Sequence, residues 1–165
     1  MIQTQNILGI SLGTRTIGMA MIVNGELVDW YVKAFKGAWS EQKKELILDT
    51  IDRMIERYTA GAFAITLKGL AVKIPNAMDR HSAVLDLHKD INFLAQGKDI
   101  ATETFSIRSL KVFCDVRNKK ELRATVFKLY PELKNEFNKD VQNRNAYYIK
   151  LFEAVLAAHV LYMQP

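Results

Sequence analysis

The first 35 residues constrain the fold of this chain more than any other segment. Gln5–Ile10 and Thr16–Val23 are two apolar runs separated by a turn that contains Gly13, and their β-branched and apolar residues predict two buried strands. Asn24–Gly25 follows the second run, and this dipeptide between apolar runs is the strongest short-range signal for a β-hairpin. Glu26–Phe35 is therefore predicted to be a third strand, antiparallel to the second.

The rest of the chain alternates between helical and strand patterns. Helices are predicted where apolar residues recur at helical spacing after a capping residue such as Ser40. The expected helices are Ser40–Tyr58, Asp79–Leu94, a segment from Asp115 or Asn118 to Leu129, and Ala146–Tyr162. The expected further strands are Ala62–Leu67 and Ile100–Ile107, and the expected loops are Lys68–Asn76 and Asn135–Asn145. This order predicts an α/β protein.

Composition limits the class of protein. The chain has 165 residues, and its three prolines and eight glycines leave little room for a linker, so we expect one domain over residues 1–165. One cysteine, Cys114, excludes an internal disulfide and favours a cytoplasmic protein. The formal net charge of +5 suits a polyanionic partner such as nucleic acid, although an ordinary basic surface has the same charge.

The opening residues carry a family resemblance. Residues 7–18, Ile-Leu-Gly-Ile-Ser-Leu-Gly-Thr-Arg-Thr-Ile-Gly, resemble the start of the RuvC-like Holliday-junction resolvases (crossover junction endodeoxyribonucleases) and of the related nucleases linked to pre-16S ribosomal RNA processing. Ala62–Thr66 resembles the fourth strand of the resolvases, and Lys150–Val155 resembles the start of their final helix. The resemblance implies a ribonuclease H-like fold, with a mixed five-stranded sheet and helices on both faces.

The resemblance also identifies the positions of the family's metal-holding acids. These positions are Ser11, Thr66, Lys150 and Glu153 in this chain, so one acid remains of four. Such nucleases use two Mg²⁺ ions held by carboxylates, and a hydroxyl cannot neutralise a dication. We expect the Lys150 ammonium to occupy the volume of a metal ion and to contact a phosphate. We therefore expect no two-metal site and no cofactor, and a weakened or absent nuclease activity.

Other acids leave an alternative open. Glu103, Asp29, Asp115 and Glu121 are either solvated surface charges or ligands for Mg²⁺ or Mn²⁺ in a rearranged site. Such a site would combine Glu153 and Glu103 with Asp29 or Asp115. Glu153 has a second interpretation, as an ion-pair partner of Lys150 three residues earlier in the same helix.

Basic residues predict a nucleic-acid surface. The candidates for phosphate contacts are Arg15, Lys68, Lys73, Arg80, Arg108 and Lys111. A second basic group around the third helix comprises Lys119, Lys120, Arg123 and Lys128. The candidates for base stacking are Trp30, Trp39 and Phe105, for which a place in the hydrophobic core is the alternative.

Three functional hypotheses follow. The leading one is a catalytically weakened or inactive relative of the resolvases that binds branched DNA or structured RNA. The second is an active metal-dependent endonuclease with the rearranged site. The third is a protein-interaction module on a degenerate nuclease fold, which forms a homodimer through Asp79–Leu94.

Overall fold

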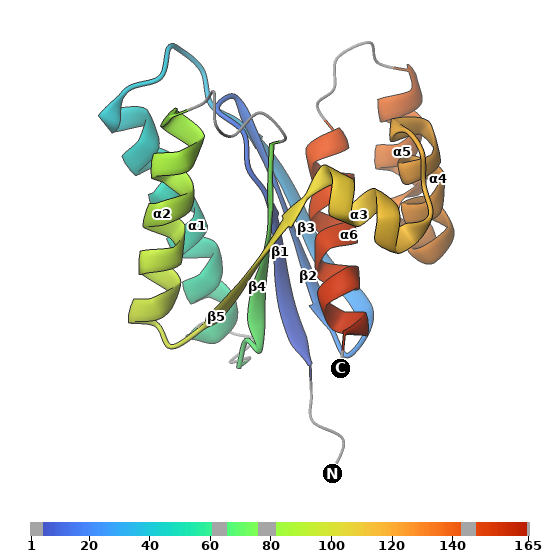
Figure 1. Cartoon of the computed structure of the whole chain (residues 1–165), viewed down its shortest axis with the longest axis horizontal. Coiled ribbons are helices and arrows are strands. Elements are labelled where there is room, and N and C mark those ends of the chain that lie inside the picture. The colour runs from blue at the N-terminus through green and yellow to red at the C-terminus, as the bar shows by residue number, and fades with distance from the viewer. Residues whose placement is uncertain (1–4, 61–65, 76–81, 143–147, 165) are drawn as a thin grey trace.

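The computed structural model describes residues 5–60, 66–75, 82–142 and 148–164. Its centre is a five-stranded sheet in the order β3-β2-β1-β4-β5, in which β1, β2 and β3 are antiparallel and β4 and β5 run parallel to β1 (Figure 1). The strands are β1 (Asn6–Ser11), β2 (Thr16–Val23), β3 (Glu26–Ala34), β4 (Gly69–Ile74) and β5 (Ala101–Ser106). The predicted meander is confirmed, and its hairpin turn has Asn24 and Gly25 at φ 52° and 86°, the left-handed values that such a turn requires.

Helices cover both faces of the sheet (Figure 1). The helices are α1 (Glu41–Thr59), α2 (Ser82–Gly97), α3 (Ile107–Cys114), α4 (Lys119–Leu129), the 3₁₀ turn η2 (Pro131–Leu133), α5 (Lys134–Gln142) and α6 (Ile149–Met163). One core lies between the sheet and α1 and α2, and the other lies between the sheet and α6 together with α3 and α4. The predicted caps Ser40 and Asn118 are confirmed, because their side chains accept hydrogen bonds from Lys43 N and Glu121 N.

The fourth strand lies further along the chain than predicted. β4 is Gly69–Ile74, within the segment Lys68–Asn76 that was expected to be a loop, so that loop prediction is wrong. Residues 62–65 of the predicted strand lie outside the described residues, and Thr66 and Leu67 are in no strand. The glycine and lysine in β4 made it resemble a loop, but Lys73 is buried here because it has an ionic partner on α6.

Two helices were not predicted. α5 replaces most of the expected loop Asn135–Asn145, whose residues 143–145 lie outside the described part. α5 has few apolar residues, and its buried residue is Asp140, which forms an ion pair with Arg123 on α4. α3 is held at its start by a capping box in which Ser106 and Ser109 each bond the backbone amide of the other.

Glycines bring α6 unusually close to the sheet. A Cβ atom on Gly9 of β1 would lie 2.1 Å from the Ala154 carbonyl oxygen, and one on Gly18 of β2 would lie 2.2 Å from the Lys150 carbonyl oxygen. Because these positions have no side chain, the backbone of α6 rests directly on β1 and β2. This contact brings the side chain of Glu153 to the end of β1.

Within the described residues, no helix combines the length and the apolar character that crossing a lipid bilayer requires.

Candidate functional site

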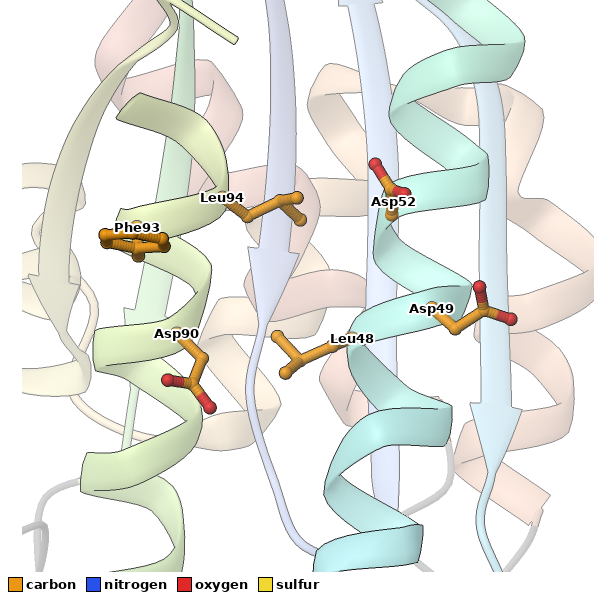
Figure 2. A pocket seen from close by; sticks show the side chains of 6 residues that line it. All are labelled: Leu48, Asp49, Asp52, Asp90, Phe93 and Leu94. Carbon is orange, nitrogen blue, oxygen red and sulfur yellow. The ribbon is translucent and has the colours of Figure 1, made fainter. Parts of the chain in front are cut away.

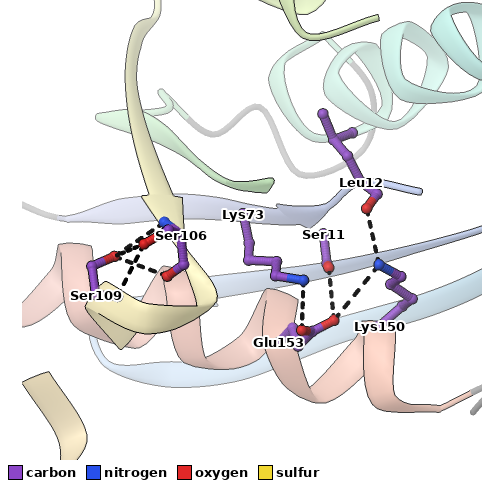
Figure 3. Close-up of polar contacts among 7 residues, drawn as sticks. All are labelled: Ser11, Leu12, Lys73, Ser106, Ser109, Lys150 and Glu153. Carbon is purple, nitrogen blue, oxygen red and sulfur yellow. Dashed lines mark hydrogen bonds and ion pairs between the residues drawn. The ribbon is translucent and has the colours of Figure 1, made fainter. Parts of the chain in front are cut away.

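A buried ionic cluster lies where β1 and β4 end (Figure 3). Ser11 and Lys73 are direct neighbours across the parallel strands, and both side chains turn toward Glu153 on α6. Lys73 Nζ lies 2.6 Å from Glu153 Oε2, and Ser11 Oγ donates a hydrogen bond of 3.2 Å to Glu153 Oε1. The three residues are 0–5% exposed, so each oxygen of the carboxylate has a partner inside the protein.

Lys150 lies at the open side of this cluster. Its Nζ donates a hydrogen bond of 3.0 Å to the Leu12 carbonyl oxygen and lies 3.8 Å from Glu153 Oε1. Gly13 makes room for it, because a Cβ atom there would lie 3.2 Å from Lys150 Cε. Burial lowers the pKa of the Lys150 ammonium to about 8, with a further lowering by the neighbouring charge of Lys73.

Lys150 also lines a hollow of about 260 Å³, which we call the turn pocket. The other residues of the turn pocket are Gly13, Thr14, Arg15, Thr16, Pro75 and Val84. The pocket therefore combines an ammonium, an exposed guanidinium and two hydroxyls. This combination suits a phosphate, which accepts hydrogen bonds from all of these groups.

The donor set of the cluster does not fit Mg²⁺. The ion prefers several oxygen ligands, and carboxylates must balance its charge. Here one carboxylate, Glu153, is already neutralised by Lys73 and lies near Lys150. Within the described residues, no group of three or more His, Cys, Asp or Glu side chains is placed to hold a metal ion.

The structure separates Thr66 from the other positions that the resemblance assigned to acids. Thr66 precedes β4, whereas Ser11 lies level with Lys73 near the other end of that strand. The carbonyl oxygen of Thr66 accepts a hydrogen bond from the Asn6 side chain, at the beginning of β1. Lys73, and not Thr66, is thus the β4 residue at the site. The predicted placement of Glu153 and Lys150 on the last helix is confirmed.

The acids of the proposed rearranged site are dispersed. Glu103 is exposed on β5, where it pairs with Ala71 rather than with Lys73. Asp29 accepts a hydrogen bond from Tyr58 of α1, on the sheet face opposite to α6. Asp115 is the C-cap of α3. The Glu121 carboxylate accepts a hydrogen bond from the backbone amide of Arg117.

The predicted basic residues divide into separate groups. Arg15 lies in the turn pocket, and Arg108 and Lys111 line a second hollow on α3. Lys68 is exposed but precedes β4 and therefore lies at the end of the sheet away from Ser11. Lys73 was expected on a loop that contacts phosphate; it is instead 5% exposed and bound to Glu153. Arg80 lies outside the described residues.

The aromatic residues predicted to stack on bases are engaged within the fold. Phe105 is 6% exposed in the core beside α6. Trp30 donates its indole N–H to Glu136 of α5, and Trp39 packs against the core beneath α1 and α2. The large exposed aromatic side chains include Phe93 on α2 and Phe113 on α3, which sequence patterns did not single out.

The comparisons with known proteins establish the fold. No protein-family model matches the chain, and no curated protein matches its sequence. The structure is similar to that of T. thermophilus RuvC in complex with a Holliday junction substrate, at 14% identity and a TM-score of 0.64 over 94% of this chain and 90% of that one. A second Thermus thermophilus RuvC structure has 12% identity and a TM-score of 0.62 over 96% of this chain and 95% of that one. The predicted ribonuclease H-like fold is thereby confirmed.

Proposed function

We propose that this chain binds structured nucleic acid, branched DNA foremost, along the edge where β1 and β4 end, and that it does not cleave the nucleic acid by the two-metal route. The observation that carries the proposal is the ion pair between Lys73 and Glu153, which places a fixed ammonium beside Ser11. In the resemblance described above, Ser11 is the position of an acid that holds a metal ion. Because Lys73 neutralises Glu153, the outer ammonium of Lys150 and the guanidinium of Arg15 can attract phosphate without any bound metal ion.

The charge of the cluster supports this proposal. Two ammonium groups, Lys73 and Lys150, stand against one carboxylate, so the cluster has a net charge of +1 when Lys150 is protonated. Lys150 is the outer of the two, since its side chain is 21% exposed and that of Lys73 is 6% exposed. Together with Arg15 it gives the turn pocket two cations. Such contacts position a nucleic-acid backbone without reading its sequence.

The similarity to RuvC supports the choice of ligand. One of the similar RuvC structures holds a Holliday junction substrate. A four-way DNA junction is therefore the first ligand to test, with linear duplex DNA and single-stranded RNA as comparisons.

The test measures binding of each labelled nucleic acid at two salt concentrations with Mg²⁺ present, followed by electrophoresis of the strands. We expect salt-sensitive binding of the junction, unchanged by EDTA, with intact strands. Arg15→Ala should weaken junction binding and reduce the salt dependence by about one phosphate contact. Lys68→Ala is the matched control, because it removes an equal charge at the other end of β4 and should leave binding unchanged.

The other outcomes favour the rival hypotheses. Cut strands in the presence of Mg²⁺ or Mn²⁺ would favour an active nuclease, provided that a Glu153→Ala variant that circular dichroism shows to be folded no longer cleaves. Failure to bind any of the three nucleic acids, together with a dimer in light scattering, would favour the protein-interaction module.

A further inference from the structure

We propose that α3 and the turn after it form a platform for unpaired nucleotides. A base stacks on Phe113 and Val112, and the flanking phosphates contact Arg108, Lys111 and Arg117. This inference rests on the proposed function and names its substrate class: nucleic acid that contains unpaired nucleotides, such as a single strand or an open branch point.

The first observation is the exposure of two large apolar side chains on one short helix. α3 buries Ile107 and Leu110 against the core, as an amphipathic helix should. Its outer surface nevertheless carries Val112, which is 76% exposed, and Phe113, which is 52% exposed. An exposed aromatic ring offers a flat apolar face, and bases of any sequence stack on such a face.

The second observation is the positive charge of the segment formed by α3, the turn after it and the start of α4. Residues 107–121 contain five basic residues and two acids, a formal charge of +3 out of the +5 of the whole chain. The Glu121 carboxylate accepts a hydrogen bond from the Arg117 amide, whereas Asp115 caps α3 through its backbone N–H. A hollow of about 520 Å³ is lined by Ile107, Arg108, Lys111, Val112, Asp115 and Val116, so it sets two cations and one acid beside Val112, the residue that precedes Phe113. Cations beside an apolar wall are the combination that binds single strands.

The third observation is the position of the platform relative to the ionic cluster. α3 begins directly after β5, and Ser106 at the end of β5 pairs with Ile74, the residue that follows Lys73 (Figure 3). The platform and the cluster therefore begin at the same edge of the sheet. The Ser106–Ser109 capping box at one end and the left-handed Asp115 at the other fix the helix in place. A nucleic acid seated at this edge of the sheet would thus continue onto α3.

The other exposed phenylalanine provides a contrast within the same molecule. Phe93 on α2 is 79% exposed and borders a hollow of about 320 Å³ between α1 and α2 (Figure 2). The polar residues that line this hollow are the acids Asp49, Asp52 and Asp90. These acids form ion pairs with Arg53, Lys98 and Lys44, and no basic residue is among the described residues that line the hollow, so a phosphate would find no cation there. Phe93 is the matched control for Phe113.

The test uses oligonucleotides with a single 5-iodouracil, placed either in an unpaired tail or within a duplex. Irradiation should cross-link the unpaired base to Phe113, identified by mass spectrometry, and the duplex base should give no such link. Phe113→Ala should weaken binding of tailed substrates about tenfold and leave binding of blunt duplex within twofold. Phe113→Trp should retain tight binding, Phe93→Ala should match the unchanged protein, and circular dichroism confirms that each variant is folded.

Two results would overturn the platform while the proposed function survives. One is unchanged binding of tailed substrates in Phe113→Ala despite salt-sensitive junction binding. The other is a dimer that Phe113→Ala dissociates, which would assign the exposed surface to a second copy of the chain. Absence of nucleic-acid binding in the unchanged protein would overturn the platform and the proposed function together.

Discussion

Replacement of Glu153 by glutamine should destabilise the protein by about 3–5 kcal/mol. The carboxylate lies 2.6 Å from Lys73 Nζ, and both side chains are 6% exposed. Glutamine keeps the shape and a hydrogen bond, but it removes the only charge opposite in sign to Lys73 and Lys150 in the cluster. Removal of one member of a buried ion pair costs about this much because the other charge stays buried without compensation.

The expected loss of stability is a large fraction of the protein's free energy of unfolding. A domain of this size unfolds with a free energy of about 5–15 kcal/mol, and for a chain of this length each kcal/mol corresponds to a Tm change of about 2–4 °C. Urea denaturation at pH 7 measures the difference directly. Glu56→Gln is the control, because Glu56 also pairs with a lysine, Lys98, but its side chain is 52% exposed. Exposed pairs contribute at most about 1 kcal/mol.

The double variant Lys73→Met, Glu153→Leu completes the test. It removes both buried charges, so its stability should recover most of what Glu153→Gln loses. A loss in Glu153→Gln no greater than in Glu56→Gln would refute the argument that the pair is desolvated. The sign of the stability change in Glu153→Gln is also informative. If Glu153 were crowded by other acids in an empty metal site, removing its charge would stabilise the protein.

Three further predictions test other parts of the structure. The pKa of Lys150 is about 8 in the folded chain and near 10.5 in the unfolded chain. Between pH 8 and pH 10.5, Lys150 is therefore mostly protonated in the unfolded state and mostly neutral in the folded state. Stability relative to Lys150→Met should therefore rise by about 2 kcal/mol from pH 8 to pH 9.5, measured by urea denaturation; a flat difference would contradict the shift. Gly18→Ala should lower the free energy of unfolding by about 3 kcal/mol or more, measured by calorimetry, because its Cβ would clash with the backbone of α6. Gly97→Ala is the control and should leave the stability nearly unchanged, because the space around Gly97 is open. Asp140→Asn should lower the free energy of unfolding by about 3 kcal/mol, measured by the same method. It should also loosen the contact of α5 with α4, because Arg123 then lacks its buried partner.

The elements predicted correctly are those with signals in the local sequence. Asn24–Gly25 has the backbone angles that its hairpin needs, and Ser40 and Asn118 each accept a hydrogen bond from the first turn of the helix they precede. These features depend on contacts between residues at most four apart. They are therefore visible without knowledge of the tertiary structure.

The elements predicted incorrectly depend on partners that are distant in the sequence. β4 contains Lys73, whose burial is understandable only with Glu153, 80 residues later. α5 buries Asp140 against Arg123, so its inward position is polar and gives no apolar period. Apolar periodicity identifies a core face only when the face is apolar. A better signal for β4 was the alternation of Leu70 and Val72 with small residues, which is the period of a strand.

The same distant pairing explains why the cluster must be interpreted as one unit. Lys73 is tolerated in the interior because Glu153 neutralises it, and Glu153 is tolerated in the buried face of an otherwise apolar helix because Lys73 and Ser11 satisfy its two oxygens. Counting the missing acids one by one treats each position as independent. In the structure the positions depend on one another, because Lys73 and Ser11 both contact Glu153. A carboxylate at position 73 in place of the lysine would set a second negative charge near Glu153 inside the protein and raise the pKa of one of the two groups. The lysine thus makes the remaining glutamate compatible with burial in the absence of any bound ion.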